Sequence, residues 1–368
     1  MSKTEGRSSD HVKSVNLALQ GGGSHGAFTW GVLDRMFEDG RIWIDAISGT
    51  SAGALNAVVA AQGMYDGGGP GARAELERFW RAVSKSGQSS PIARTAFDKM
   101  LGTWSLDASP AYVWLDLLSR VASPYDLNPM NVNPLRDLVA GFVDFAKVQD
   151  CADMPIFVSA TNVETGQVRV FQREEITLDA VMASACLPFM FHAVEIDGAP
   201  YWDSGYMGNP VLFPFIDFSP CADIVVVQIN PVTRPGTPRA ARDILNRMNE
   251  ITFNSSLLSE LRAIEFIDRL IDEGRVDPND FRKVHVHILT GEARMLELGA
   301  SSKVITEWAF LEHLRDLGRD AAGAWIARHF DDINTRSTVD IRGMFGGYGP
   351  RAADGPPQSG GRPNGDGE

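Results

Sequence analysis

The chain has 368 residues, of which 44% are hydrophobic and 22% are charged, a composition typical of a globular protein long enough to bury a large core. Its net charge of -13 argues against nucleic-acid binding and against strong attachment to anionic membranes by charge alone, because both need dense positive patches. Three scattered cysteines are too few for a disulfide framework or a zinc site, so we expect buried thiols at Cys151, Cys186 and Cys221.

The N-terminal segment, residues 1–13, is polar and mixed in charge, and no apolar run follows it that would make a signal peptide. No stretch of the sequence approaches the ~18 uninterrupted apolar residues that a membrane span needs. We therefore expect a flexible N-terminus and a cytoplasmic protein, which leaves room for peripheral contact with membranes.

Residues 15–83 alternate between strand-like and helix-like patterns. Short apolar runs that stop at glycines predict buried strands, and apolar residues spaced by three and four predict helices. The expected order is strand 15–19, helix 26–37, strand 42–47, helix 51–64, a glycine break at 66–71 and helix 72–83. This order predicts an α/β fold with a mainly parallel sheet flanked by helices.

Segment 86–133 is rich in proline, serine and aromatic residues, and its pattern is harder to assign to helices or strands. The α/β pattern then resumes with strands 155–160 and 167–171, helix 178–186, a hairpin with arms 194–196 and 200–202 around Asp197-Gly198, strand 224–229, one or two helices over 239–271, strand 284–289 and two helices to about 330. The apolar stripe of 239–271 predicts a face packed on the sheet.

The C-terminal segment, residues 343–368, contains nine glycines and four prolines in 26 residues, which predicts a disordered tail. We see no internal repeats. The chain therefore reads as one large domain, residues 14–340, with flexible ends.

The strongest chemical signal is the run Gly49-Thr50-Ser51-Ala52-Gly53. It matches Gly-x-Ser-x-Gly and lies between an apolar strand and an alanine-rich helix, the setting of a nucleophile elbow. Side chains at either glycine would crowd the turn, and the positive end of the following helix favours developing negative charge. The alternative interpretation is a serine that only caps a helix.

A second glycine turn, Gly21-Gly22-Gly23-Ser24-His25-Gly26, follows the first strand. It fits the dinucleotide fingerprint, with Asp45 as the acidic residue near the next strand. It also fits a loop that offers backbone N–H groups to an oxyanion. We favour the oxyanion interpretation, because the second strand runs on into the Ser51 turn and so brings both loops to one edge of the sheet.

Three motifs in this order resemble the patatin-like phospholipase family over about residues 15–230. The first two are the glycine loop and the Ser51 turn, and the third is Asp203-Ser204-Gly205 after the predicted hairpin. The segment 183–188 also looks like a block of that family. The resemblance implies a three-layer sandwich and a serine acyl-hydrolase acting in lipid catabolism.

The resemblance further implies a dyad of Ser51 as nucleophile and Asp203 as general base. It implies an oxyanion hole formed by the glycine loop and Ala52, with no cofactor. Desolvation by neighbours such as Tyr201 and Trp202 would raise the pKa of Asp203 towards a useful range. A histidine triad remains the alternative, with His192 as its best base.

The sequence departs from the family pattern at two positions. His25 stands where arginine or lysine is common, which would make the charge in the loop depend on pH near neutrality. Ser204 stands where the family has glycine or alanine, which bears on the backbone around Asp203. No calcium loop, zinc spacing or phosphate-binding lysine motif is present, so we expect hydrolysis without a metal.

The expected substrate is a lipid acyl ester, as the resemblance implies. Segment 86–133 would either cap the site with an apolar channel or membrane-facing surface, or pack into the core. Two other hypotheses stand beside the esterase, a dinucleotide-binding protein and a catalytically silent scaffold that binds lipid or a partner protein. The sequence does not indicate an oligomeric state.

Overall fold

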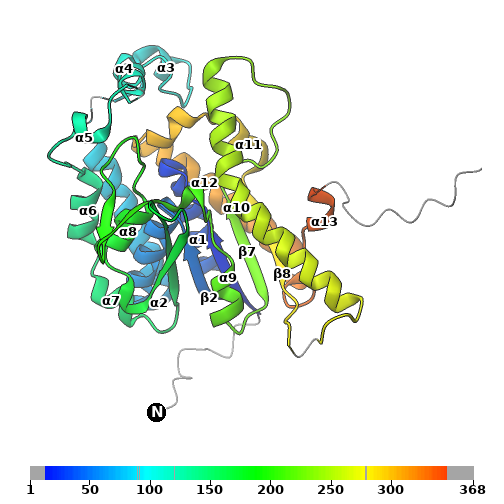
Figure 1. Cartoon of the computed structure of the whole chain (residues 1–368). Coiled ribbons are helices and arrows are strands. Elements are labelled where there is room, and N and C mark those ends of the chain that lie inside the picture. Colours follow the sequence, from blue (N-terminus) through cyan, green and yellow to red (C-terminus); the bar gives the residue numbers. More distant parts are fainter. Residues whose placement is uncertain (1–12, 89, 91, 120, 278–279, 346–368) are drawn as a thin grey trace, which may run out of the picture.

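The structure is a computed structural model that describes residues 13–345 apart from 89, 91, 120 and 278–279 (Figure 1). The predicted tail lies outside the described residues beyond Phe345, and the predicted flexible N-terminus lies outside them before Lys13. Within the described part of the chain, every helix is too short or too polar to cross a membrane.

An eight-stranded mixed sheet forms the centre of the molecule, with strand order β5-β6-β3-β2-β1-β7-β8 and β4 paired with β3. The five strands β3, β2, β1, β7 and β8 run parallel, whereas β4, β5 and β6 pair antiparallel. The strands are β1 Lys13–Leu19, β2 Ile42–Gly49, β3 Ile156–Asn162, β4 Val168–Gln172, β5 Val194–Ile196, β6 Ala199–Asp203, β7 Asp223–Gln228 and β8 His285–Thr290. Each predicted strand is therefore present, within one or two residues of its expected ends.

Helices cover both faces of this sheet. The longer helices are α1 Gly26–Asp39, α2 Ala52–Gly87, α4 Pro110–Leu118, α6 Pro134–Phe142, α10 Ala241–Asp272 and α12 Trp308–His329. The shorter ones are α3 Ala96–Met100, α5 Pro124–Leu127, α7 Phe145–Asp150, α8 Leu178–Ser184, α9 Phe213–Phe218, α11 Glu292–Leu296 and α13 Ile341–Met344. The described part of the chain also contains the 3-10 helices η1 Gly23–His25, η2 Arg173–Glu175, η3 Ser204–Tyr206, η4 Ala300–Val304 and η5 Phe330–Asp332.

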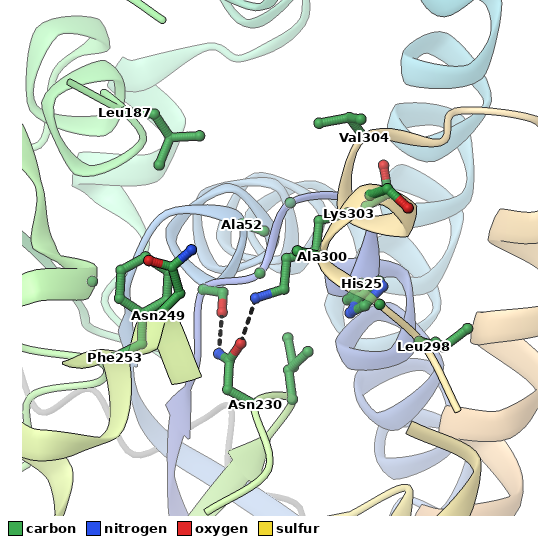
Figure 2. Close-up of a pocket in the computed structure, with 18 of the residues that line it drawn as sticks. His25, Ala52, Leu187, Asn230, Asn249, Phe253, Leu298, Ala300, Lys303 and Val304 are labelled. Atoms are coloured by element: carbon green, nitrogen blue, oxygen red, sulfur yellow. Dashed lines mark hydrogen bonds between the residues drawn. The ribbon is translucent and has the colours of Figure 1, made fainter. Parts of the chain in front are cut away.

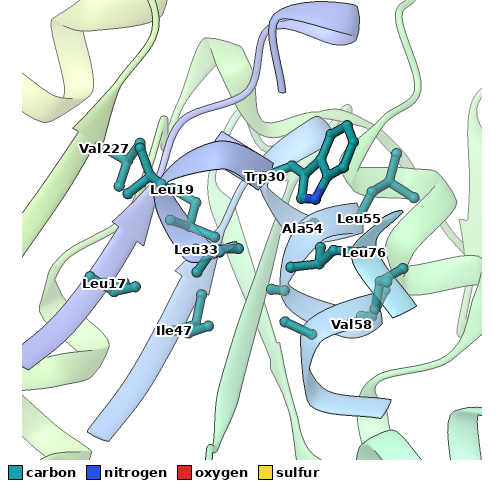
Figure 3. Close-up of a cluster of buried hydrophobic side chains, with 14 of the residues drawn as sticks. Leu17, Leu19, Trp30, Leu33, Ile47, Ala54, Leu55, Val58, Leu76 and Val227 are labelled. Atoms are coloured by element: carbon teal, nitrogen blue, oxygen red, sulfur yellow. The ribbon is translucent and has the colours of Figure 1, made fainter. Parts of the chain in front are cut away.

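Alternate residues of the central strands point into two separate cores. Leu17 and Leu19 of β1 pack with α1, α2 and α12 on one face (Figure 3), whereas Ala18 packs with α9 and α10 on the other. Full burial of one leucine side chain stabilises a fold by about 1.5–3 kcal/mol, so this alternation fixes the register of β1. The result is the three-layer α/β sandwich that the resemblance implied.

The glycine break predicted at 66–71 is a kink inside one helix. Gly67 and Gly68 have non-helical backbone angles, and Pro70 follows them, so α2 changes direction between its two predicted halves. The first half starts at the sheet edge directly after Ser51. This half carries the small side chains that allow close packing on α1 and β2.

The prediction that the apolar stripe of 239–271 packs on the sheet is correct only for the second half of α10. Leu257, Leu261 and Ile264 are buried in the core on that face. Met248 and Ile251 in the first half of α10 are 57% and 55% exposed, because this half of the helix lies beyond the end of the sheet. The first half of the helix instead forms a wall beside the loops that follow β1 and β2 (Figure 1).

Part of segment 86–133 packs into the core, and part of it presents an apolar surface near the site, so each of the two expectations holds for a part. Leu106 is buried in the core, and the ring of Trp104 lies 4.9 Å from that of Phe310. Helices α3 to α5 instead present large apolar side chains to solvent, among them Trp114, Leu117 and Met130. These three helices lie above the end of the sheet where the loops after β1 and β2 meet (Figure 1).

Candidate active site

Ser51 occupies a sharp turn between β2 and α2. Its backbone angles, φ 54° and ψ -118°, lie in a region that side chains rarely adopt, and such a residue stores about 1–3 kcal/mol of strain. The hydroxyl of Ser184 accepts a hydrogen bond of 2.8 Å from the Ser51 N–H and holds the turn. Gly53 allows α2 to start there, because a Cβ at this position would meet the carbonyl oxygen of Leu19. The predicted elbow geometry is therefore present.

Asp203 ends β6, directly after the predicted hairpin. Strand β6 pairs with β3, and β3 pairs with β2, so the sheet brings Asp203 to the edge where Ser51 lies. The side chain is only 3% exposed, and its Oδ1 accepts a hydrogen bond of 2.6 Å from the Gly205 N–H. Its backbone is held by Cys186 and Thr161 through bonds of 2.8 and 3.0 Å.

The surroundings of Asp203 raise its pKa. Burial is the main cause and brings the pKa to about 6, because an ionised carboxylate loses its hydration in the interior. Hydrogen bonds from the Gly205 N–H and from the side chain of Ser51, which faces this carboxylate, act in the opposite direction. A carboxyl group with a pKa near 6 is a stronger base than an ordinary aspartate and is still ionised at neutral pH.

The glycine loop lies against the Ser51 turn, and a buried network holds it. The N–H of Gly21 donates to Asn209 Oδ1 at 2.7 Å, and the Gly21 carbonyl accepts from Asn230 Nδ2 at 2.8 Å. Gln20 lies beneath the loop and accepts bonds of 2.9 Å from the backbone N–H groups of Ile229 and Asn230. The loop is thus fixed from both β7 and the segment after η3.

These hydrogen bonds determine which backbone N–H groups of the loop remain available to an oxyanion. The Gly21 N–H is already donated to Asn209, so the expectation that it contributes to an oxyanion hole is wrong in this arrangement. Among the described residues, no acceptor is seen for the N–H groups of Gly22, Gly23 and Ala52. Gly22, Gly23 and Ala52 line the same pocket as Ser51. Ser24 and His25 line it as well, whereas Gly26 packs against Ala52 at the start of α1.

The expectation that His25 carries a charge that depends on pH near neutrality is wrong. Its ring is buried, and Nε2 lies 2.7 Å from Ser302 Oγ, which in turn donates to the Gly299 carbonyl. Burial, followed by the charge of Lys303, lowers the pKa of His25 to about 3. The imidazole is therefore neutral throughout the physiological range and brings no pH-dependent charge to the loop.

His192, the alternative base, does not face the nucleophile. Its Nε2 lies 3.2 Å from the Pro124 carbonyl, and its ring stacks on Tyr125 with centroids 4.1 Å apart. Ser204 disturbs nothing around Asp203, because its buried hydroxyl donates to the Gly208 carbonyl at 3.0 Å and the bond from Gly205 to Asp203 is kept. Gly49 and Gly53 flank the turn, as predicted.

Asp45 does not support a dinucleotide site. It lies in the middle of β2, four residues before the strand ends, and accepts a bond of 2.7 Å from Ser219. The glycine loop lies instead at the carboxyl end of β1. The acidic partner that a dinucleotide-binding loop needs is thus absent from the loop's end of β2.

One pocket of about 1380 Å³ brings the candidate residues together. It is lined by Ser51, Asp203, Gly205 and the glycine loop, and by residues that the sequence analysis missed. Figure 2 shows His25 and Ala52 in this pocket together with two of the missed residues, Asn230 and Lys303. The missed residues are Asn209, Asn230 and Lys303, which come from three separate segments that carry no local motif. Within the described residues, no cluster of His, Cys, Asp and Glu could hold a metal ion.

The chain matches one family model. A family model described as patatin-like phospholipase matches residues 17–216, which are 200 of the 368 residues. None of the curated proteins matches the chain. The match extends from β1 to α9 and includes the glycine loop, the Ser51 turn and Asp203.

Among solved structures, the chain is similar to VipD from Legionella pneumophila, with 14% identity, a TM-score of 0.35, and coverage of 86% of this chain and 69% of that chain. It is also similar to the type III effector protein ExoU, with 14% identity, a TM-score of 0.32, and coverage of 86% and 53%. For full-length ExoU in complex with SpcU from Pseudomonas aeruginosa, the identity is 13% and the TM-score 0.29, with coverage of 84% and 53%. The chain thus spans about half the length of ExoU. On the family match over more than half of its length, the chain belongs to the patatin-like phospholipase family.

Proposed function

We propose that the chain is a lipid acyl-ester hydrolase of the phospholipase A type, with Ser51 as nucleophile and Asp203 as general base. The observation that carries this proposal is one juxtaposition. A serine in a strained turn faces a buried carboxyl group whose pKa is about 6, and both line one pocket. The family match supports lipid hydrolysis in general, and the geometry supports these two residues in particular.

In the proposed acylation step, the Ser51 hydroxyl attacks the carbonyl carbon of the ester and its proton passes to the Asp203 carboxylate. The carbonyl oxygen gains the negative charge. We assign its stabilisation to the N–H groups of Gly22, Gly23 and Ala52 and to the positive end of α2. When the tetrahedral intermediate collapses, the ester C–O bond breaks and Asp203 returns the proton to the leaving alcohol.

In the proposed deacylation step, Asp203 takes a proton from a water molecule that attacks the acyl–Ser51 ester. The fatty acid is released, and the proton returns to the Ser51 oxygen. Both steps use the same base in the same ionisation state, so the reaction depends on Asp203 being deprotonated when substrate binds.

The proposed acyl-binding side of the pocket is apolar. Helices α4 and α6 and segment 187–191 contribute its side chains, which are Tyr112, Leu135, Leu138, Leu187, Phe189 and Met190. Phe189 and Met190 are 67% and 40% exposed, so this wall continues to the protein surface. This apolar surface fits a long acyl chain, whose binding is stabilised by about 0.8 kcal/mol for each CH₂ group that it buries.

The test is covalent labelling by a fluorophosphonate probe, followed by a panel of phospholipids, lysophospholipids, acylglycerols and polyesters. We expect labelling at Ser51 and release of fatty acid from at least one lipid class. A protein that binds lipid but takes up no probe and releases no fatty acid would instead be a silent scaffold, and the proposal would be wrong.

We further propose that helices α3 to α5 contact the lipid aggregate from which the substrate enters. Trp114 and Leu117 are 64% and 60% exposed in α4, the helix whose Tyr112 lines the pocket. We expect Trp114→Ser combined with Leu117→Ser to lower hydrolysis of vesicle lipids about tenfold, because two large apolar side chains no longer enter the lipid. Hydrolysis of a water-soluble short-chain ester should change less than about twofold.

A matched control is Ile216→Ser in α9, which is 44% exposed at the opposite end of the sheet (Figure 1). This variant should hydrolyse both substrates like the parent protein. Equal rates of the double variant and the parent on vesicles would show that the exposed surface does not meet lipid.

A further inference from the structure

Lys303 brings a positive charge to the pocket from a segment far from the glycine loop in sequence. It lies in η4 and is partly buried, and its Nζ donates to Asn230 Oδ1 at 2.7 Å (Figure 2). An ammonium group has three N–H donors, and one bond to the protein is seen for it among the described residues. Asn230 also donates to the Gly21 carbonyl, so Lys303 is linked to the loop beside Ser51.

The backbone holds η4 against the loop. Gly23 has a φ of +58°, and a Cβ there would meet the carbonyl oxygen of Lys303. A second contact between η4 and the loop is the hydrogen bond between His25 and Ser302. Because His25 is neutral, the loop itself has no charged side chain, and Lys303 is the cation that η4 places over it. Burial lowers the pKa of Lys303 to about 8, so it remains mostly protonated at neutral pH.

Two arginines extend the positive charge along the same wall of the pocket. Arg234 forms a salt bridge of 2.7 Å and Arg247 one of 3.1 Å, both with Glu250 of α10. Glu250 is 8% exposed and also attracts Lys303. Asp203 attracts Lys303 as well, and Asp243 attracts Arg234, so carboxylates partly balance these three cations. The two arginines are held in salt bridges, whereas the hydrogen bond seen for the Lys303 ammonium goes to a neutral amide.

The wall of the pocket that carries Arg234, Arg247 and Lys303 is formed by different elements from the apolar wall. Arg234, Arg247 and Lys303 come from the segment after β7, from α10 and from η4, whereas the apolar wall comes from α4, α6 and segment 187–191. In Figure 2, Lys303 lies between Asn230 and Ala52, with Leu187 away from it on the far side. An ester at Ser51 would thus have its acyl chain on one side and its alcohol portion on the other.

We propose that Lys303 determines substrate specificity by binding a phosphate group on the alcohol side of the lipid ester, with Arg234 and Arg247 adding to the positive field. The inference rests on the proposed function, because it takes the scissile ester to lie at Ser51. Among the described residues the Lys303 ammonium donates to Asn230, and a neutral alcohol portion would offer no charged acceptor to its remaining N–H groups. A lipid phosphate supplies several strong acceptor oxygens at this position.

The kinetic test compares two substrates that differ only in the phosphate, dioctanoyl phosphatidic acid and dioctanoylglycerol. We expect Lys303→Gln to lower kcat/KM for the phosphate-bearing lipid about 10- to 100-fold, mainly through KM, because a charge-assisted bond is lost. Its kcat/KM for dioctanoylglycerol should change less than about threefold. Lys303→Arg should recover part of the loss, and Lys283→Gln, at an exposed lysine outside the pocket, should behave like the parent protein.

A binding experiment separates this inference from the proposed reaction. Calorimetric titration would compare 1-O-dodecylglycerol 3-phosphate with 1-O-dodecylglycerol, two ether lipids that cannot be hydrolysed at an ester. We expect tighter binding of the phosphate lipid, and loss of that preference in Lys303→Gln. If neither protein hydrolyses any ester but this preference is seen, the proposed function fails and with it the role of Lys303 in specificity, while phosphate binding by Lys303 stands. If the parent protein hydrolyses esters but shows no such preference, the inference fails and the proposed function stands.

Three results would overturn the inference. Equal losses on both kinetic substrates would show that Lys303 acts on the ester itself or on the fold. An unchanged preference for phosphate in the variant would show that the anion binds elsewhere. In a further titration with dodecanoate, a loss of affinity in Lys303→Gln as large as the loss for the phosphate lipid would place Lys303 on the side of the acyl carboxylate.

Discussion

Replacing Ser51 with alanine is expected to lower ester hydrolysis by on the order of 10⁴- to 10⁶-fold and to abolish fluorophosphonate labelling. The Ser51 hydroxyl is the atom that would form the covalent bond, and alanine removes it. Alanine keeps the turn's bond to Ser184, which uses the backbone N–H, so the fold should be retained. Probe labelling read by intact-protein mass, with fatty-acid release measured in parallel, checks both expectations.

A serine elsewhere on the pocket provides the control for this substitution. Ser90 lines the same pocket and is exposed. Ser90→Ala should keep both labelling and turnover. Labelling that persists in Ser51→Ala would place the nucleophile at another residue and would contradict the dyad.

The residues of the candidate dyad could be predicted because each lies in a local signal. Gly49 and Gly53 around Ser51 reflect a turn in which a Cβ has no room, and this requirement is written in five consecutive residues. Asp203 follows a hairpin whose turn, Asp197-Gly198, has positive φ at both positions, as the sequence indicated. Period-two patterns likewise predicted the strands that carry them.

The residues that hold the loop and charge the pocket could not be predicted in this way. Asn209, Asn230 and Lys303 meet only because the sheet order brings the ends of β1 and β7 together and η4 packs on the loop. None of them lies in a motif. His25 was misjudged for the same reason, because its burial depends on Ser302, which lies 277 residues away.

Helix α10 shows a limit of the periodicity argument. Its apolar stripe is continuous in sequence, but the sheet beneath it ends part of the way along. The pattern predicts which residues share a face of the helix. It does not indicate how far the neighbouring layer extends, and so Met248 and Ile251 are exposed where a packed face was expected.

Replacing Asp203 with asparagine is expected to lower kcat/KM about 10²- to 10⁴-fold, because an amide cannot accept the proton of Ser51. Since the pKa of Asp203 is about 6, activity of the parent protein should rise as the pH increases through about 6 and level off above it. Asp197→Asn in the same hairpin, at an exposed carboxylate, is the control and should leave rate and pH profile unchanged. A profile without an acid limb near pH 6 would contradict Asp203 as the base.

The same carboxyl group should lower the stability of the fold, and this gives the dyad a test that needs no substrate. The folded pKa of about 6 lies above the ordinary value of 3.8, so the folded protein binds more protons than the unfolded chain between these values. Its free energy of unfolding should therefore fall as the pH rises from about 4 to 6, by roughly 3 kcal/mol from this group. Above pH 6 the loss is complete. Asp203→Asn should unfold at a higher temperature than the parent protein at pH 8, with a smaller or reversed difference at pH 4, since asparagine does not ionise. Equal pH dependence of Tm in both proteins would mean that Asp203 is not the buried, raised-pKa group on which the proposed mechanism depends.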